Sequence, residues 1–169
     1  MPLTIRPATA ADAATILGFI RELAEFEKLA HEVVATEELL REHLFGPARR
    51  GAEAVIAEVD GAPVGYALFF HSFSTFLGRP GIYLEDLYVR PAHRSQGHGQ
   101  RLLAHLARLA VERGCGRLEW SVLDWNARAL SFYRRLGAEP LSEWTVQRLT
   151  GDALRRLAAD APVAGGGVP

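Results

Sequence analysis

The sequence predicts an α/β fold in which one mixed sheet carries helices on both of its faces. Strand-like segments in the first half of the chain pair as hairpins, whereas those in the second half alternate with helices. A turn containing Gly97 and Gly99 joins a strand directly to a long helical pattern. The 169 residues are 49% hydrophobic and 23% charged, as in ordinary globular proteins, so one domain with a full core is expected.

The first two predicted elements are a short strand and a helix. The strand covers residues 3–6 and stops at Pro7, which has no N–H to donate to a ladder. Thr9 and Asp12 have a spacing like that of a capping box, in which side chains satisfy backbone N–H groups where a helix begins. Apolar residues follow at steps of three and four, the period of one helix face: Ile16, Phe19, Ile20, Leu23 and Phe26.

A second helix and a hairpin come next. The helix is expected from about Thr36, and Gly46-Pro47 ends it because proline cannot continue a helix. Strands are predicted for residues 52–59 and 63–70. They flank Asp60-Gly61, a dipeptide that is typical of tight hairpin turns.

The middle of the chain combines a loop, a strand, a glycine turn and a long helix. Residues 72–81 are predicted to form the loop, and residues 83–89 a strand of aromatic, aliphatic and β-branched side chains. Pro91 ends that strand. The helix follows Gly99, because apolar residues again recur at three- and four-residue steps: Leu102, Leu103, Leu106, Leu109 and Ala110.

The last third of the chain alternates strand and helix. Residues 117–123 have the alternation of a strand, and residues 127–136 are predicted to form a helix that Gly137 ends. Residues 141–149 alternate again and are predicted to form a last strand. A short closing helix is expected over residues 150–158.

Composition limits the class of protein. One domain is expected over residues 1–158, followed by a disordered tail over 159–169 that is rich in Ala, Gly, Pro and Val. No apolar run is long enough to cross a bilayer, and the first residues lack the layout of a secretory signal. The single cysteine, Cys115, supports neither an intramolecular disulfide nor a cysteine-based zinc site. The net charge of −1 argues against nucleic-acid binding, so a cytoplasmic enzyme or binding protein is expected.

Charge is distributed unevenly along the chain. An early stretch is rich in glutamate: Glu22, Glu25, Glu27, Glu32, Glu37, Glu38 and Glu42. Arginines gather around the glycine turn and the helix after it: Arg90, Arg94, Arg101, Arg108, Arg113 and Arg117. One part of the fold would then favour cations and another anions, although solvated helix faces explain such runs equally well.

The turn at 94–99 has the chemistry of an anion site. It lies between a strand and a helix N-terminus, where free N–H groups point outward and the helix dipole favours negative charge. Gly97 and Gly99 let the backbone approach a phosphate without intervening Cβ atoms, and Arg94 and Arg101 add positive charge. The turn lacks the third glycine of the dinucleotide fingerprint and the Gly-Lys-Ser/Thr of a Walker A loop. A tight turn before an amphipathic helix is the plainer alternative.

Arg94-x-x-Gly97-x-Gly99, after a strand and before a helix, resembles the acetyl-CoA pyrophosphate loop of the GNAT acetyltransferase superfamily. The resemblance extends from about residue 3 to about residue 158 and implies a single twisted sheet of six to seven strands, mostly antiparallel. Further stretches are similar to the diamine (spermidine/spermine) acetyltransferases and their thialysine-acetylating relatives: Ile5-Arg6-Pro7-Ala8-Thr9, Glu22-Leu23-Ala24 with Glu27, Tyr83-Leu84-Glu85-Asp86, Leu123-Asp124-Trp125-Asn126-x-Arg128-Ala129, and Phe132-Tyr133-x-x-x-Gly137-Ala138.

The resemblance implies acetyl-CoA as co-substrate and no metal. Strand N–H groups near Leu87 or Val89 would polarise the acetyl carbonyl. Asn126 would hydrogen-bond the pantetheine arm as well as cap its helix, and capping alone is the alternative. The residues that the resemblance assigns to the coenzyme are Leu87, Tyr88, Val89, Arg94, Ser95, Gln96, Gly97, His98, Gly99, Gln100, Asn126, Ala129 and Tyr133.

Tyr133 is the candidate general acid. A phenol has a pKa near ~10, so its hydroxyl is protonated at neutral pH and can donate. Displacement of acetyl from CoA by an amine releases a thiolate, which a positioned phenol can protonate. The resemblance assigns this role to the tyrosine of the Phe-Tyr-x-x-x-Gly segment, which is Tyr133 here. A core tyrosine beside Phe132 is the alternative.

Glu85 and Asp86 are adjacent acids in a predicted strand, so their side chains are expected on opposite faces. At least one must then face the covered side, where an acid is costly unless it binds something. The resemblance places Glu27 and Glu85 around the cationic amine, with Asp86 and Phe76 as further substrate contacts. Glu85 would also help to relay the amine's proton through water, since an alkylammonium with a pKa near ~10.4 must lose a proton before it attacks. For Glu27, an exposed helix residue paired with a neighbour is the alternative.

The sequence departs from the family pattern at two places. His98 stands where an aliphatic residue is usual, and both His93 and His98 are expected to be solvated loop histidines rather than bases. Polyamine-specific members carry an acid and a tryptophan before Tyr83, whereas Ser74 and Phe76 stand there in this sequence. Because each distant ammonium of a polyamine needs its own partner, a shorter amine or a lysine-like amino acid is favoured.

The favoured function is an acetyl-CoA-dependent N-acetyltransferase that transfers acetyl directly to a primary amine of a small cationic substrate, such as a diamine, a polyamine or a lysine-like amino acid. A protein or peptide N-acetyltransferase of the same fold and a non-catalytic acyl-CoA-binding module are the alternatives. No nucleic-acid or membrane partner is expected. The resemblance also implies a homodimer in which residues 144–149 pair with or exchange between protomers.

Overall fold

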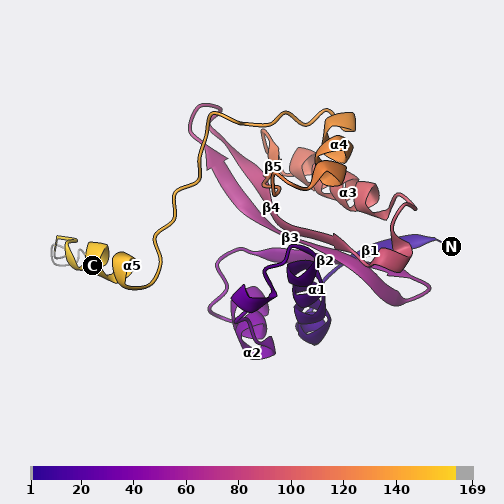
Figure 1. The fold of residues 1–169 in the computed structure, drawn as a ribbon, viewed down its shortest axis with the longest axis horizontal. Coiled ribbons are helices and arrows are strands. Elements are labelled where there is room, and N and C mark those ends of the chain that lie inside the picture. The colour runs from indigo at the N-terminus through magenta and orange to yellow at the C-terminus, as the bar shows by residue number, and fades with distance from the viewer. Residues whose placement is uncertain (1, 163–169) are drawn as a thin grey trace. The chain divides into compact units, whose positions relative to one another are not determined.

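The computed structural model describes residues 2–162, and Figure 1 shows its helices and strands. Contacts divide the chain into two units, one up to Val122 and one from Leu123 onward, and we describe each in turn. The single domain expected over residues 1–158 stays a prediction. Of the expected tail, residues 163–169 lie outside the described residues, whereas Ala159 belongs to the last helix.

One sheet with the strand order β1-β2-β3-β4-β5 forms the centre of the first unit (Figure 1). Neighbouring strands are antiparallel except β4 and β5, which are parallel. The prediction of a mixed, mostly antiparallel sheet is confirmed, but the expected number of six to seven strands is wrong, because the sheet formed by residues 2–162 has 5. The strands are β1 (Leu3–Pro7), β2 (Glu53–Val59), β3 (Ala62–Ser74), β4 (Arg79–Val89) and β5 (Leu118–Trp120).

The missing strand is the one predicted for residues 141–149, which form a turn and irregular backbone instead. That prediction rested on alternating side chains, yet Trp144 and Val146 are each 80% exposed. Alternation gives a segment a face to bury, but a strand also needs a neighbour for its backbone N–H and C=O groups. No strand within residues 2–162 pairs with this segment.

The hairpin of β3 and β4 is longer than the sequence indicates. Residues 72–81, predicted as a loop, mostly extend the two strands, and Ser74 pairs with Arg79 at the end of the ladder. The turn beyond it is tied by the Leu77 N–H, which donates to Ser74 Oγ at 3.2 Å. Phe76 lies in this turn and is 99% exposed.

Helices cover both faces of the sheet in the first unit, with α1 and α2 on one face and α3 on the other (Figure 1). This arrangement confirms the predicted layers. The helices are α1 (Ala13–Phe26), α2 (Glu37–Leu40, continued by a π-helical turn Arg41–Phe45) and α3 (His98–Glu112), with short 3-10 turns at Ala10–Asp12, Ala30–Glu32 and Pro91–His93.

Aromatic side chains from α1 and the sheet form the centre of one core. The Phe19 ring stacks on the Tyr66 ring at 5.4 Å between centroids, and Tyr88 lies 6.0 Å from Phe19. Leu68 of β3 packs against this core. The next residue, Phe69, points to the opposite face of the sheet, where the Arg113 guanidinium at the end of α3 lies 6.0 Å from the centroid of the Phe69 ring. These contacts identify which side chains of β3 face which helix.

The predicted capping box is confirmed at the entry to α1. The Thr9 N–H donates to Asp12 Oδ2 at 2.8 Å, and Arg6 binds the same carboxylate through both terminal nitrogens, at 2.8 and 2.9 Å. Arg6 also donates to Glu58 on β2 at 2.9 Å. Because the hydrogen bond from Arg6 stabilises the charged form, the pKa of Asp12 falls to about 2.

In the second unit, two helices are separated by irregular chain. They are α4 (Ala127–Arg135) and α5 (Gly151–Ala159), which confirm the helices predicted for residues 127–136 and 150–158 within a residue or two. Gly137 follows α4 with φ +85°, as a glycine that ends a helix in the left-handed conformation does.

Candidate active site

A β-bulge in β4 shapes the site. Across the β3–β4 ladder, Leu68 opposes Asp86 while Phe69 opposes Leu84, so Glu85 is the extra residue of the bulge. Side chains alternate along a regular strand, and one extra residue reverses which face the later positions occupy. Leu84 therefore shares a face with Phe69 on the α3 side, whereas Asp86 shares a face with Leu68 on the α1 side.

The bulge brings Asp86 against buried aromatic residues under α1. The Tyr66 hydroxyl donates to Asp86 Oδ2 at 2.5 Å, and Tyr66 itself is 0% exposed. Burial raises the pKa of Asp86, and the Tyr66 hydrogen bond opposes that rise. Burial and the Asp86 charge in turn raise the pKa of Tyr66 well above its usual value, so Tyr66 is a fixed donor at neutral pH.

Glu27 completes an acidic pair with Asp86. It follows the last residue of α1 and is half-buried. Burial raises the pKa of Glu27, and the neighbouring Asp86 charge raises it further. Two like charges in a partly dry site repel each other, and a cation between them would relieve that repulsion. The pair therefore has the electrostatics of a site for an ammonium group.

Glu85 is exposed at the bulge. Its charge makes the smallest of the contributions that raise the pKa of Tyr66. One of the two adjacent acids does face the covered side, as expected, and it is Asp86. The structure thus brings Glu27 together with Asp86, and it leaves Glu85 at the rim. Sequence reasoning missed Tyr66, because only the β3–β4 register shows that its hydroxyl reaches Asp86.

Strands β4 and β5 part just before the bulge. Their parallel pairing covers only Ile82 to Leu84 on β4, opposite Leu118 to Trp120. From Glu85 to Val89, the edge of β4 next to β5 has no strand partner in the described residues. This edge includes the expected coenzyme residues Leu87, Tyr88 and Val89, and unpaired strand edges offer N–H and C=O groups to an extended ligand.

The glycine turn presents unoccupied backbone donors. Gly97 is the N-cap of α3 with φ +79°, Ser95 also has a positive φ of 64°, and no side chain caps the helix. Within residues 2–162, no group accepts a hydrogen bond from the backbone N–H groups of residues 96–100. A Cβ placed on Gly99 would meet nothing within 4 Å, so the approach from outside is open. Successive bare amides in such a turn fit the diphosphate of a coenzyme.

Arg94 fixes the chain between β4 and this turn. Its Nε donates to the Val89 carbonyl at 2.7 Å, and its guanidinium lies over the Phe26 ring at 5.1 Å and the Tyr88 ring at 5.4 Å. These contacts hold the end of β4 against the end of α1. Arg94 thus links α1, which ends beside Glu27, to β4, which leads into the glycine turn. This structural role adds to the positive charge that the sequence analysis assigned to Arg94.

His98 is buried rather than solvated, contrary to expectation. It begins α3 on the same face as Leu102 and Leu106, four and eight residues later, and is 5% exposed. Neither ring nitrogen has a hydrogen-bond partner in the described residues. Burial lowers the pKa of His98, with smaller contributions from Arg101 and His93. The helical period, which places position 98 in the core, was the signal that could have shown this.

Replacing His98 by leucine should raise the free energy of unfolding by about 1–3 kcal/mol at pH 7.5, because it removes buried polar atoms without partners. The folded state resists protonation of His98, so wild-type stability should also fall below pH ~6.5, the pKa of an unfolded histidine. Thermal unfolding between pH 5 and 8 measures both effects. His31→Leu, at an exposed position, is the matched control and should change little. A lower melting temperature for His98→Leu than for wild type would show that the imidazole stabilises the fold.

In the second unit, Asn126 caps α4 by accepting the Ala129 N–H at 3.2 Å. Both interpretations of Asn126 expect this cap, and its role toward a pantetheine arm stays a prediction. Tyr133 lies on α4, half-buried, with its ring 5.4 Å from that of Phe132. The proposed acid and the expected cap therefore lie on the same helix, two turns apart.

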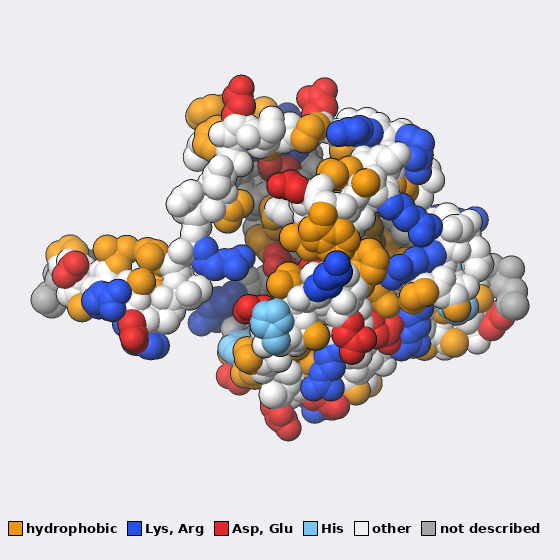
Figure 2. Space-filling model, viewed as in Figure 1, with side chains coloured by type: hydrophobic (Ala, Val, Ile, Leu, Met, Phe, Trp, Pro, Cys, Tyr) orange, Lys and Arg blue, Asp and Glu red, His pale blue; other side chains and the backbone are white. Residues whose placement is uncertain are grey.

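Side chains of both charges lie together on the face of the molecule around α1 and α2 (Figure 2). Two of the early glutamates form ion pairs with arginines, Glu22 with Arg90 at 3.0 Å and Glu37 with Arg41 at 2.8 Å.

Residues 2–162 contain neither a candidate metal-binding group nor a candidate membrane-spanning helix. No group of three or more His, Cys, Asp or Glu side chains in that part of the chain is arranged to hold a metal ion. No helix there combines the length and apolar character needed to cross a bilayer.

The fold resembles that of an integron cassette protein from the mobile metagenome of V. cholerae, with a TM-score of 0.77, 26% sequence identity, and coverage of 94% of this chain and 98% of that one. A thialysine N-epsilon-acetyltransferase of Bos taurus is 44% identical over 91% of this chain and 96% of its own length. An L-ornithine N5-acetyltransferase of Arabidopsis thaliana is 33% identical over 90% of this chain and 86% of its own. The acetyltransferase (GNAT) family profile matches residues 18–138. The chain therefore belongs to the GNAT family of acetyltransferases.

Proposed function

We propose that the protein transfers the acetyl group of acetyl-CoA directly to a primary amine of a small cationic substrate. The observation that carries this proposal is the layout of β4 and the turn after it. An acidic pair with raised pKa values lies at the bulge, and bare amides suited to a diphosphate follow some ten residues later at 96–100. A cation site and an anion site at the two ends of an unpaired strand edge fit a cationic acceptor and an anionic coenzyme.

When bound, acetyl-CoA supplies an acetyl group activated as a thioester. The N–H groups of residues 96–100 would hold its diphosphate, and the N–H of Leu87 or Val89 would polarise the acetyl carbonyl. Glu27 and Asp86 would bind the substrate ammonium, with Glu85 at the rim accepting its proton through water. Tyr133 would give its hydroxyl proton to the departing sulfur. Asn126 and Ala129 would line the pantetheine arm, and Phe76 the outer part of the amine site.

A lysine-like amino acid is the acceptor that we favour. Relatives named for thialysine and L-ornithine acetylation support an amine carried by an amino acid. Ser74, which stands where polyamine-specific relatives carry an acid, is 3% exposed and binds the Leu77 N–H. It therefore offers no charge to a distant ammonium. We also propose a cytoplasmic homodimer, which light scattering on the purified protein would test through its mass.

A CoA-release screen tests the proposed function. Lysine, ornithine, thialysine, diamines and polyamines are compared with lysine-bearing and N-terminal peptides at equal concentration. Turnover with the small amines and little with peptides is the expected result. Preference for peptides would favour a protein acetyltransferase, and tight acetyl-CoA binding without CoA release would favour a binding module.

Gly99→Ala should weaken acetyl-CoA binding by roughly tenfold without destabilising the protein. The added Cβ meets nothing in the free protein, and alanine favours a helix over glycine, so stability should hold or rise. In the complex, the same atom would separate the amides from the diphosphate. Calorimetric titration with acetyl-CoA measures the effect, with Gly18→Ala in α1, also unobstructed, as control. Unchanged affinity would place the diphosphate elsewhere.

A further inference from the structure

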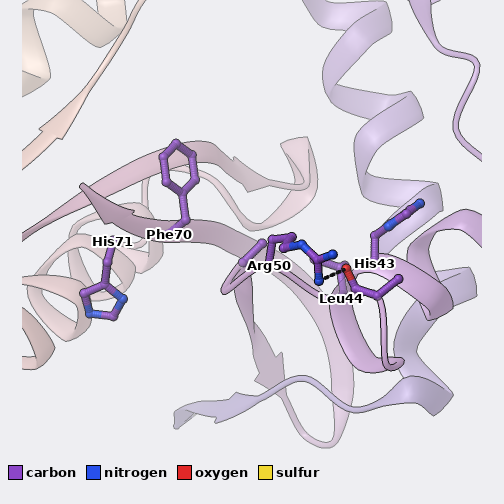
Figure 3. A pocket seen from close by; sticks show the side chains of 7 residues that line it. His43, Leu44, Arg50, Phe70 and His71 are labelled. Atoms are coloured by element: carbon purple, nitrogen blue, oxygen red, sulfur yellow. Dashed lines mark hydrogen bonds between the residues drawn. The ribbon is translucent and has the colours of Figure 1, made fainter. Parts of the chain in front are cut away.

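A cavity of about 280 Å³ opens where the sheet edge is incomplete. β2 begins at Glu53, opposite Phe69, so β3 from Phe70 onward has no strand partner on that side among the described residues. The residues between α2 and β2 border the gap instead, and the cavity is lined chiefly by His43, Leu44, Arg50, Phe70 and His71. In Figure 3, His43, Leu44 and Arg50 lie together on one side of the view, and Phe70 and His71 point in opposite directions from β3.

The cavity reaches the same face of the sheet as the acidic pair. Tyr66, Leu68 and Phe70 alternate onto one face of β3, and Tyr66 on that face stacks against Phe19 of α1. Leu44, on the cavity wall, belongs to the same core cluster as Phe19 and Tyr66. Phe70 is therefore on the α1 side, as Asp86 is.

The spacing along β3 sets the distance from the acidic pair to Phe70, on the wall of the cavity. Leu68 lies directly opposite Asp86, and Phe70 is two residues further, which is about 7 Å along a strand. Phe70 packs against Tyr83 of β4, with ring centroids 5.2 Å apart, so this wall of the cavity lies beside the strand that carries Asp86. The amine and α-carbon of lysine are separated by five single bonds of about 1.5 Å each, which gives a similar reach.

The cavity carries positive charge without a carboxylate partner. The Arg50 guanidinium donates only to the carbonyls of Ala48 and Arg49, at 3.4 Å each. No carboxylate in residues 2–162 lies within ion-pair distance of it. Glu53, at the start of β2, is bound instead by Arg113 at 2.7 and 2.9 Å. An arginine fork with open donors matches the geometry of a carboxylate.

We propose that Arg50 binds the α-carboxylate of the amine substrate, with Phe70 packing against its methylene stem. This inference rests on the proposed function and narrows the substrate class to basic α-amino acids. A diamine of the same length carries the same second ammonium without the carboxylate, so it offers Arg50 no partner and leaves the two positive charges uncompensated. The acidic pair would then select the amine to be acetylated, and Arg50 would select the molecule that carries it.

Kinetics with matched substrates test this site. Lysine and ornithine are compared with cadaverine and putrescine, which are the same molecules without the carboxylate. In Arg50→Gln, kcat/KM for the amino acids should fall by about tenfold to a hundredfold through KM, while the diamines hold or improve. Arg50→Lys should restore part of the loss. Arg49→Gln, which removes the neighbouring arginine outside the cavity lining, should change neither class.

Equal losses for amino acids and diamines in Arg50→Gln, or no loss for either, would overturn the proposal. Wild-type protein that acetylates no small amine would instead refute the proposed function. In that case, the affinities of lysine and cadaverine for wild type and for Arg50→Gln, measured by calorimetry, still test whether Arg50 binds the carboxylate. Equal binding of lysine to the two proteins would reject it.

Discussion

Tyr133→Phe should lower kcat by about 10²–10⁴-fold, the range for loss of a general acid, and leave acetyl-CoA affinity unchanged. Phenylalanine keeps the ring beside Phe132 and removes only the hydroxyl, so α4 should stay folded. Without a proton donor, the sulfur must leave as a free thiolate, and the barrier to C–S cleavage rises.

Steady-state CoA release measures kcat for this variant, and calorimetry measures its acetyl-CoA affinity. Phe132→Leu, which alters the packing but keeps the hydroxyl, separates the two contributions of this part of α4. If Tyr133→Phe kept full turnover, the hydroxyl would not be the acid. If it lost affinity for acetyl-CoA as well, its role would be in binding.

Asp86→Asn should lower kcat/KM for the amine by roughly a hundredfold, since it removes a buried charge facing a cation. Asparagine still accepts the Tyr66 hydroxyl, so the local packing is kept. Glu85→Gln is the paired comparison, and its loss should be smaller because Glu85 is exposed. A larger loss of kcat/KM in Glu85→Gln than in Asp86→Asn would show that Glu85, and not Asp86, is the main acid that binds the amine.

The same Asp86→Asn variant should be more stable than wild type at neutral pH. Burial raises the pKa of Asp86 above its unfolded value, so the folded state binds more protons than the unfolded state between those two values. Wild-type stability therefore falls as pH rises through that window, and the neutral amide avoids the loss. Chemical unfolding at pH 7.5 and near pH 4 should show the variant's advantage only at the higher value. An equal or opposite difference at both values would contradict the assignment of a costly buried charge.

Local patterns were sufficient to predict most elements of the fold. The capping box at Thr9 and Asp12, the Asp60-Gly61 turn and the leucine spacing of α3 each follow from contacts within a few residues. The prediction of a strand at 141–149 was wrong because a strand needs a neighbouring strand to pair with, and alternating side chains do not show whether one is present.

The acidic site shows the same limit more sharply. Strict alternation at Glu85 and Asp86 cannot say which acid is buried, because one extra residue in β4 reverses the faces beyond it. The bulge has no signature in the residues themselves. Asp86 therefore emerges as the partner of Glu27 only from the β3–β4 register, and Tyr66 with it. The prediction that His98 is solvated was wrong because it treated His98 as a loop residue. His98 is the first residue of α3 and lies on the buried face of that helix.

The most direct test is a crystal structure of the protein with CoA. The diphosphate oxygens should accept hydrogen bonds from the N–H groups of residues 96–100, and the Tyr133 hydroxyl should lie within hydrogen-bond distance of the sulfur. A diphosphate bound away from that turn, or a Tyr133 hydroxyl out of reach of the sulfur, would contradict the account.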